Sequence, residues 1–331
     1  MRLLIDGRPL VGNRTGIGVH TAEIAGRLHE VPLIASHAVI ENRQGLENAA
    51  FRVDHSPFGL LWQQTILPEI ECEVLWGPHG TLPFTWRKPS VVTIHDFTSI
   101  TMPGRHRLKT ILSFNLFIGR SLEIATRVAC VSRRVADEAM RGFGVAADRI
   151  EIVPNGVDSF FSPGGEEQDY ILFTGTIEPR KGIDDLFAVW WSLPEPRPRL
   201  VLAGDAGWKT RVPEGAEVLG YVTRERLREL YRGARVFVYP SRYEGFGIPP
   251  LEAMACGAPV IATRTGAIPE FAGDAAVLVD PGDRDALRAS LIRLLGDADL
   301  RRDLRTRGPE RAKLYDWNRS ATLMTELLRC G

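Results

Sequence analysis

Short apolar runs alternate along this chain with segments in which apolar positions recur at helical spacing. Continuous apolar runs are typical of parallel strands buried on both faces, and the helical segments between them are their crossover connections. The pattern predicts an α/β protein made of doubly wound, Rossmann-like units. Strands are expected at about 2–5, 31–40, 73–76, 90–94, 127–131, 170–174, 199–203, 218–222, 235–238 and 276–280, and helices at about 19–29, 58–70, 133–141, 249–255, 283–295, 301–314 and 317–329.

The alternation restarts halfway along the chain, which predicts two domains. At 331 residues the chain is long enough for two domains of ordinary size. Residues 162–168 (SPGGEEQ) are polar and rich in turn formers, so they are the candidate linker. We expect a first domain at 1–162, a second at 163–314, and a closing segment at 315–331 that contains the last helix.

Composition narrows the class of protein. The 41 basic residues balance the 41 acidic ones, so nothing indicates nucleic acid as a partner. The four cysteines lie far apart, without the spacing of a metal site or a disulfide framework, as in proteins with reduced thiols. Asp6 interrupts the first apolar run too early for a signal peptide, and no run approaches the ~20 apolar residues that span a bilayer. We therefore expect a cytoplasmic protein of enzyme size.

The segment 239–259 (YPSRYEGFGIPPLEAMACGAP) carries the strongest chemical signal. Its glycine loop, Gly245-Phe246-Gly247, precedes a predicted helix, where free backbone N–H groups and the helix dipole suit a phosphate. Glu244 and Glu252 flank the loop, and carboxylates so placed can accept hydrogen bonds from the paired hydroxyls of a ribose or a hexose. The alternative is that Glu244 is solvated and that Glu252, expected in the first helical turn, only complements the dipole.

This motif resembles the signature of the retaining glycosyltransferases of family four, which have the GT-B fold. The resemblance rests on Glu244, Gly245-Phe246-Gly247, Ile248, the prolines and Glu252, and continues through residues 259–262 and Gly266. It implies two Rossmann-like domains that face each other across a cleft, with a C-terminal helix crossing back to the first domain. It also implies that the second domain binds a nucleotide sugar: Glu252 binds the ribose, while Glu244 and residues 245–248 bind the sugar.

Two features of the first half can contribute chemistry. Gly16 and Gly18 follow the first strand, although the third glycine of a dinucleotide fingerprint is absent, because Thr21 stands in its place. An ordinary tight turn is the alternative, and the resemblance implies that both glycines approach the donor. His95 and Asp96 end the strand at 90–94, at the edge where such sheets bind ligands. His95 resembles the family's histidine that faces the reacting sugar; Asp96 either orients the imidazole or meets the acceptor.

The loop after the strand at 170–174 carries the adjacent cations Arg180 and Lys181. An arginine fork beside a lysine point charge can hold a diphosphate, and the resemblance implies that use. Many family members carry a basic residue where this chain has Thr176. The resemblance also implies that the loop at Val222 edges the nucleobase. Thr223, the next residue, is expected to cap the helix that follows. We expect no metal ligand, because Asp283 and Asp285 begin a predicted helix that Asp283 would cap.

A basic, apolar segment in the first half allows two interpretations. Arg105, Arg107 and Lys109 precede an apolar run at 111–118. The segment is either a helix that contacts an anionic membrane surface peripherally or, more commonly, a surface helix packed on the sheet.

Together these features predict a metal-independent glycosyltransferase without a cofactor. The resemblance implies that it moves a hexose to a saccharide or lipid-linked acceptor with retention of configuration. The loop at 175–181 resembles that of bacterial mannosyl- and rhamnosyltransferases that build surface glycans, which favours GDP-mannose as the donor. The alternatives are a nucleotide-binding oxidoreductase, a phosphorylase of the same architecture and a non-catalytic nucleotide-sugar-binding protein. The sequence does not indicate an oligomeric state.

Overall fold

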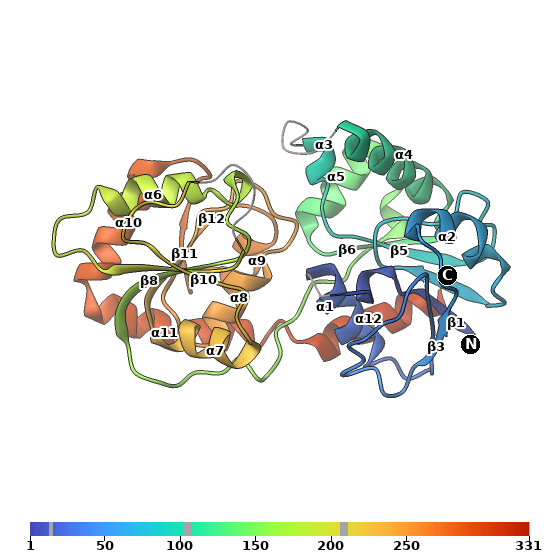
Figure 1. Ribbon diagram of the computed structural model, residues 1–331, viewed down its shortest axis with the longest axis horizontal. Helices are drawn as coiled ribbons and strands as arrows, with labels where there is room; N and C mark the ends of the chain where they lie inside the picture. Colours follow the sequence, from blue (N-terminus) through green and yellow to red (C-terminus); the bar gives the residue numbers. More distant parts are fainter. Residues whose placement is uncertain (13–15, 102–107, 206–210, 331) are drawn as a thin grey trace. The chain divides into compact units, whose positions relative to one another are not determined.

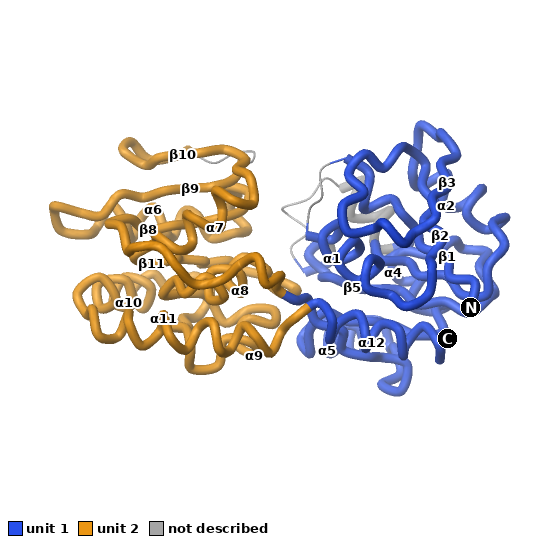
Figure 2. The backbone as a smooth tube through the Cα atoms, turned by 90° about the horizontal axis from the view of Figure 1, so that it is seen from below, with its two compact units in different colours: residues 1–156, 317–331 blue, residues 157–316 orange. Residues whose placement is uncertain are grey.

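The chain divides into two compact units. The computed structural model describes residues 1–12, 16–101, 108–205 and 211–330, except for the side chains of residues 99 and 108–115. Unit 1 consists of residues 1–156 and 317–331, and unit 2 of residues 157–316 (Figure 2). The boundary after residue 156 lies six residues before the one expected from the linker composition. Residue 316, the last of unit 2, lies two residues beyond the expected end of the second domain.

In the described part of unit 1, seven strands form one parallel sheet in the order β3-β2-β1-β4-β5-β6-β7. The order reverses between β1 and β4, and ligands in such sheets bind beyond the carboxyl ends of the strands near that point. The strands are β1 (Leu3–Asp6), β2 (Leu33–Ser36), β3 (Ala50–Val53), β4 (Val74–Gly77), β5 (Ser90–Ile94), β6 (Arg127–Cys130) and β7 (Ile150–Ile152).

Helices cover both faces of this sheet (Figure 1). The helical elements are η1 (Arg8–Leu10), α1 (Gly16–Ala25), α2 (Gly59–Thr65), η2 (Leu67–Glu69), α3 (Thr98–Thr101), α4 (Leu108–Ile124), α5 (Arg133–Phe143), η4 (Ala147–Arg149) and α12 (Trp317–Arg329). The last of these, α12, packs beside α1, and its side chains Trp317, Met324 and Leu328 are buried in the same apolar core as β1 and β4. The end of the chain therefore completes the core of the first unit.

In the described part of unit 2, six strands form a second parallel sheet in the order β10-β9-β8-β11-β12-β13. Helices α6 and α10 cover one face, and α7, α8 and α11 the other (Figure 1). The strands are β8 (Gln168–Thr174), β9 (Arg199–Ala203), β10 (Glu217–Gly220), β11 (Ala234–Tyr239), β12 (Val260–Thr263) and β13 (Val277–Val279). The helical elements are η5 (Pro179–Lys181), α6 (Ile183–Trp191), α7 (Arg224–Gly233), α8 (Ile248–Ala255), α9 (Ile268–Ala272), α10 (Arg284–Gly296) and α11 (Ala298–Ala312).

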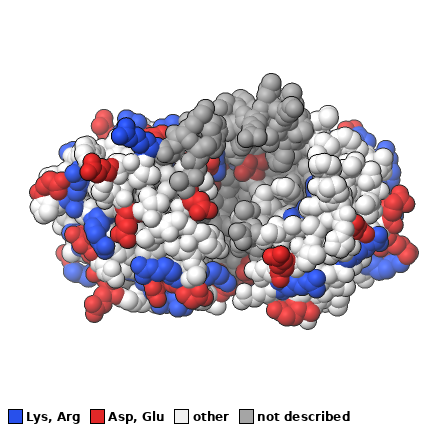
Figure 3. Space-filling view, viewed as in Figure 1, with Lys and Arg blue, Asp and Glu red and all other residues white. Residues whose placement is uncertain are grey.

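The α/β class and the doubly wound sheets are confirmed, and several local predictions hold. Asp283 caps α10 through the backbone N–H of Ala286, and Thr223 caps α7 through that of Arg226. On the visible face of each unit, Lys and Arg side chains are mixed with Asp and Glu (Figure 3), as expected from the balanced net charge.

Two placements near the candidate site were wrong. Helix α1 begins at Gly16 instead of about residue 19, so Gly16 and Gly18 lie in its first turn. Helix α8 begins at Ile248, which puts Glu252 in the second turn, beyond the residues that complement the dipole. Gly16 and Gly18 led to the prediction of a loop, but glycine is also tolerated in a helix. Residue types alone locate helix ends only approximately. The strands β3 and β7 were not predicted; none of their residues is buried, so no buried apolar run marks them.

Candidate active site

The loops that follow β8 and β11 are held against each other at Gly182. This residue has φ +66°, and a Cβ atom there would lie 1.9 Å from the carbonyl oxygen of Pro240. Next to it, the backbone N–H of Arg242 donates to the carbonyl of Arg180 at 2.9 Å. Only glycine allows this close approach. The approach brings the cationic pair Arg180 and Lys181, at the end of η5, to the segment that contains Glu244.

Lys181 and Glu244 form the centre of a buried polar cluster. The Lys181 Nζ donates to Glu244 Oε1 at 2.6 Å and to the Tyr239 hydroxyl at 2.8 Å. Tyr239 in turn donates to the same carboxylate oxygen at 3.0 Å, and Ser241 Oγ at 2.6 Å. The sequence indicated the lysine and the glutamate but not Tyr239 or Ser241. Tyr239 is the last residue of β11 and Ser241 lies two residues after it, so their place at a strand end was the available signal.

The charges in this cluster keep Glu244 ionised. Burial alone would raise the pKa of Glu244, but the positive charges of Lys181 and Arg180 outweigh burial and lower it. Arg180 is also engaged by Glu178, whose Oε1 lies 2.7 Å from its Nη2, and its Nη1 lies 3.9 Å from Glu244 Oε1. The solvated alternative for Glu244 is wrong, because only 8% of the residue is exposed. The cluster presents two fixed cations and a carboxylate at the carboxyl edge of the sheet.

Glu252 lies on α8 and has a different environment. Its Oε2 accepts a hydrogen bond from the Tyr231 hydroxyl of α7 at 3.0 Å, and Thr174 Oγ1 lies 3.0 Å from the same hydroxyl. Burial raises the pKa of Glu252 to about 7, although the Tyr231 hydrogen bond opposes the rise. This carboxyl group therefore changes its charge near neutral pH.

The glycine loop approaches the backbone after β12. A Cβ atom on Gly266, whose φ is +58°, would lie 2.7 Å from the carbonyl oxygen of Glu244 and 2.9 Å from that of Gly245. Phe246 is buried against Phe271 of α9, with ring centroids 5.4 Å apart, so it anchors the loop. Gly247 precedes α8, and because residues 249 and 250 are prolines, the free N–H groups here belong mainly to Gly247 and Ile248.

Two other loops of unit 2 lie at the same edge of the sheet. Val222 follows β10, where Gly220 accepts a hydrogen bond from the N–H of Gly204 at 2.8 Å. Thr176 is exposed and lies two residues after the end of β8. Arg180, Lys181, Val222 and Glu244 thus lie beyond the carboxyl ends of β8, β10 and β11. The other site residues expected in unit 2 lie on α8 and in the glycine loop before it.

Unit 1 brings its own candidates to the carboxyl edge of its sheet. His95 follows β5, and its Nε2 lies 2.9 Å from the carbonyl oxygen of Pro78, so this nitrogen carries the proton and donates. Burial lowers the pKa of His95 to about 4, which makes it neutral at physiological pH. Asp96 does not contact the His95 ring through a hydrogen bond in the structure; its Oδ1 accepts from the N–H and hydroxyl of Thr98. Its side chain therefore binds the first residue of α3.

A residue that sequence reasoning missed, His20 of α1, lies against His95 with ring centroids 4.7 Å apart. Asp6, Arg8, Gln63 and Thr81 were missed as well: they form a buried hydrogen-bonded group where β1 ends, and in it Gln63 Nε2 donates to Asp6 Oδ2 at 2.9 Å.

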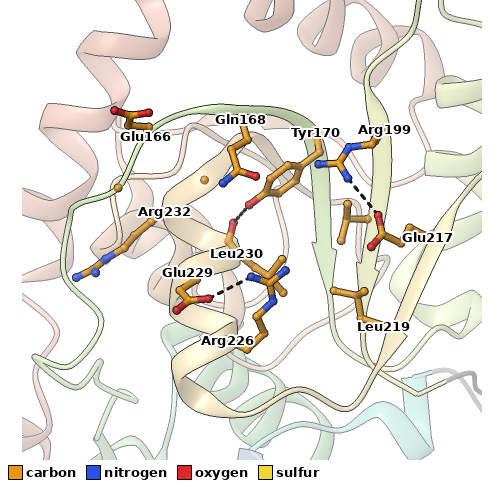
Figure 4. A pocket seen from close by; sticks show the side chains of 13 residues that line it. Glu166, Gln168, Tyr170, Arg199, Glu217, Leu219, Arg226, Glu229, Leu230 and Arg232 are labelled. Atoms are coloured by element: carbon orange, nitrogen blue, oxygen red, sulfur yellow. Dashed lines mark hydrogen bonds and ion pairs between the residues drawn. The ribbon is translucent and has the colours of Figure 1, made fainter.

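A cavity of about 250 Å³ in unit 2 lies elsewhere. Figure 4 shows Tyr170, Arg199, Arg226 and Glu229 around it, which come from the amino ends of the strands and from α7. Four of its charged side chains are paired with one another: Arg226 with Glu229, and Arg199 with Glu217. Because the phosphate-type features are at the opposite ends of the strands, we do not assign this cavity to the site.

Three further findings concern metals and membranes. Within the described ranges, no group of three or more His, Cys, Asp or Glu side chains is arranged to hold a metal ion. In the same part of the chain, no helix combines the length and apolar character needed to cross a membrane. Of the basic, apolar segment, Arg105 and Arg107 and the side chains of Lys109 and residues 111–115 lie outside the described residues.

Comparisons with known proteins agree with this architecture. Residues 158–311 match the family described as "Glycosyl transferases group 1", and residues 52–159 match "Glycosyltransferase Family 4". The O-antigen chain mannosyltransferase B of Escherichia coli is 32% identical over 97% of this chain and 98% of its own.

Among solved structures, Anabaena Alr3699/HepE in complex with UDP and glucose is similar over 99% of both chains, with a TM-score of 0.81 and 18% identity. WaaG, a glycosyltransferase involved in lipopolysaccharide biosynthesis, is similar over the full length of both chains, with a TM-score of 0.76 and 16% identity. These structures confirm the fold, and the sequence matches favour a glycosyltransferase over a nucleotide-binding oxidoreductase. Two parallel Rossmann-like units and an extensive match to a sequence relative lead to one conclusion: the chain belongs to the glycosyltransferases of family four, enzymes with the GT-B fold.

Proposed function

We propose that this chain transfers a hexose from a nucleotide-diphosphate sugar, with GDP-mannose as the favoured donor, to a saccharide or lipid-linked saccharide with retention of configuration. The observation that carries the proposal is the Lys181–Glu244–Tyr239 cluster beside Arg180, which combines fixed positive charge with an ionised carboxylate. The mannosyltransferase name of the relative that matches nearly the whole chain supports the choice of sugar.

In this proposal, unit 2 binds the donor. Glu252 accepts hydrogen bonds from the ribose hydroxyls, the loop at Val222 edges the base, and Glu244 with the backbone of residues 245–248 holds the sugar. Arg180 and Lys181 neutralise the charge that grows on the leaving diphosphate as the glycosidic bond breaks. These cations take the part that a metal ion can play in other transferases, so the reaction needs no metal and no cofactor.

Unit 1 supplies the acceptor side and His95. The neutral imidazole, with its proton on Nε2, leaves Nδ1 as an acceptor for a sugar hydroxyl. The N-terminal turn of α1 at Gly16 and Gly18 approaches the donor through backbone groups. With no protein nucleophile assigned, the acceptor hydroxyl attacks on the face from which the diphosphate leaves. The bond from the sugar to the diphosphate breaks, the new glycosidic bond forms, and the hydroxyl proton passes to the departing diphosphate oxygen, so the configuration is retained.

A donor panel tests the proposal. Purified protein is incubated with GDP-mannose, UDP-glucose, UDP-galactose and GDP-fucose, with a mannose-containing oligosaccharide and with EDTA in parallel. We expect release of GDP from GDP-mannose, a new α-linked product by NMR, and no loss of rate with EDTA; Glu252→Ala should weaken donor binding. Release only from a uridine donor would contradict the donor, an inverted product would contradict retention, and inhibition by EDTA would contradict metal independence.

A further inference from the structure

His20 is a fully buried histidine for which the proposed reaction gives no role. It lies on α1, and its exposed fraction is 0%. Its ring contacts His95 edge to face, with centroids 4.7 Å apart and an interplanar angle of 88°. The ring centroids of Trp76 and Trp317 each lie 6.1 Å from that of His20. A polar ring is therefore enclosed by aromatic side chains beside the histidine that we place at the reacting sugar.

A single hydrogen bond sets the tautomer of His20. Its Nδ1 lies 2.7 Å from Asn155 Oδ1, and because an amide oxygen only accepts, Nδ1 carries the proton. Burial lowers the pKa of His20 well below its usual value, and His95 lowers it further, so the ring is neutral. The other nitrogen, Nε2, is buried and has no hydrogen-bond partner among the described residues.

A buried nitrogen without a hydrogen-bond partner lowers the stability of the fold, so a side chain with only a packing role is not expected to carry one. A phenylalanine would occupy a similar volume between Trp76 and Trp317 without that penalty. A cost of this kind is expected where a side chain serves function at the expense of stability.

His20 also lies where the chain leaves and re-enters unit 1. Asn155 comes directly before Gly156, the last residue of the first stretch of this unit, and Trp317 is the first residue of the second stretch. Ser320 joins the two stretches as well, since its Oγ donates to the carbonyl of Pro154 at 2.6 Å. Both passages of the chain therefore meet at the ring that contacts His95.

We propose that His20 is a positioning residue: locked by Asn155, it holds the His95 imidazole in one orientation and one tautomer for glycosyl transfer. The inference rests on the proposed function for the role of His95. His95 is fixed on one side by the carbonyl of Pro78, which takes its Nε2 proton, and on the other by the perpendicular His20 ring. As long as both rings stay neutral, His95 presents Nδ1 as an acceptor.

The charged and titratable groups around this pair are few. His20 faces His95; Asn155, Trp76 and Trp317 are neutral. His95 is influenced by Asp96 and by His79. A charge introduced at Asn155 would therefore act mainly on His20 and, through it, on His95.

The test combines kinetics with ¹⁵N NMR of the histidine rings in the full chain. In the native protein we expect the Nδ1–H tautomer for His20 and the Nε2–H tautomer for His95. His20→Phe should lower kcat at least tenfold, change the donor KM less than twofold, and give mixed tautomers for His95.

Asn155→Asp should raise the pKa of His20. The kcat of this variant should then increase with pH as His20 loses its proton, a dependence that the native enzyme lacks. His37→Phe, which removes another histidine beside a tryptophan, serves as the matched control.

The outcomes separate this inference from the proposed function. If His20→Phe keeps kcat within twofold and leaves the His95 signals unchanged, the positioning role is wrong. If His20→Phe does not fold, the Asn155→Asp enzyme decides: a pH dependence of kcat identical to that of the native enzyme would show that the positioning role is wrong. If His95→Ala remains fully active, the proposed role of His95 fails, and with it a positioning role for catalysis, whatever the tautomers show.

Discussion

Lys181 acts on two groups at once. It donates to Glu244 and to Tyr239, and its side chain is only 13% exposed, so little freedom is lost when a ligand arrives. A cation held before binding stabilises charge on a leaving group more effectively than one that must be ordered during the reaction. The sequence showed only two adjacent basic residues and did not indicate that the Lys181 side chain is held in place. Its hydrogen bond to Glu244 holds it.

Removing this cation should impair catalysis more than folding. We expect Lys181→Ala to lower kcat about a hundredfold, as is typical for the loss of one preorganised charge-stabilising contact. The measurement is kcat and donor KM with the best donor, together with thermal unfolding. Lys313→Ala, at an exposed lysine paired with Glu310, is the control and should change neither quantity. A Lys181→Ala enzyme within threefold of native kcat would contradict the role.

Glu252 predicts a pH dependence of donor binding. Its pKa is raised to about 7, so the group is ionised above this pH and protonated below it. A protonated carboxyl has lost part of its capacity to accept hydrogen bonds from ribose hydroxyls. One pH unit below the pKa about a tenth of the group is ionised, so the donor KM should rise up to about tenfold between pH 8 and pH 6.

Two variants check the origin of that dependence. Glu252→Gln should bind the donor weakly with a KM that is flat over this range. Tyr231→Phe removes the hydrogen bond that opposes the rise in pKa, so the midpoint should move to higher pH. A native KM that does not change between pH 6 and pH 8 would contradict the assignment of Glu252 to the ribose.

At the scale of elements, the site depends on where loops pass close to one another. Gly182 ends η5, and its closeness to Pro240 decides where Arg180 and Lys181 lie. We expect Gly182→Ala to destabilise the fold by about 2 kcal/mol or more, because the Cβ atom meets the Pro240 carbonyl and the φ of +66° disfavours a side chain. Thermal and denaturant unfolding measure this change, and kcat should fall with it.

A glycine in a different setting provides the control. Gly142 lies near the end of α5, and a Cβ atom there would meet nothing within 4 Å. Gly142→Ala should stabilise the protein by up to about 1 kcal/mol through helix propensity. Equal effects of the two substitutions would show that the approach of Gly182 to Pro240 is not needed.

At the scale of the whole molecule, unit 2 is formed by one continuous stretch of chain, whereas unit 1 is formed by two separate stretches. Unit 2 is one continuous stretch whose ends are joined, since the N–H of Val157 donates to the carbonyl of Tyr315 at 2.8 Å. Unit 1 needs α12, because Trp317, Met324 and Leu328 are buried in its core. A core that loses several large apolar side chains is strongly destabilised.

Fragments test this difference. Residues 157–316 expressed alone should unfold cooperatively, as observed by circular dichroism during heating. Residues 1–156 should not, and adding the 317–331 peptide should restore a cooperative transition. If the 1–156 fragment folded as stably without the peptide, α12 would be dispensable for the core of unit 1.

The sequence by itself determined the α/β class, the repetition of the strand pattern, the helix caps at Thr223 and Asp283, and the residue types that suit a nucleotide sugar. These features are local: a period of apolar positions, a capping residue or a glycine loop is complete within a few neighbouring residues. The misplaced starts of α1 and α8 show the limit of local signals, because helix ends depend on packing as well as on propensity.

Only the tertiary structure decided which of those residues act together. Lys181 and Glu244 are 63 positions apart and His20 and Asn155 are 135 apart, yet both pairs are within hydrogen-bonding distance. The roles of Tyr239, Tyr231 and His20 follow from these contacts. No local pattern encodes them, because the fixed charges and tautomers arise from burial and from partners that the fold brings in from distant parts of the chain.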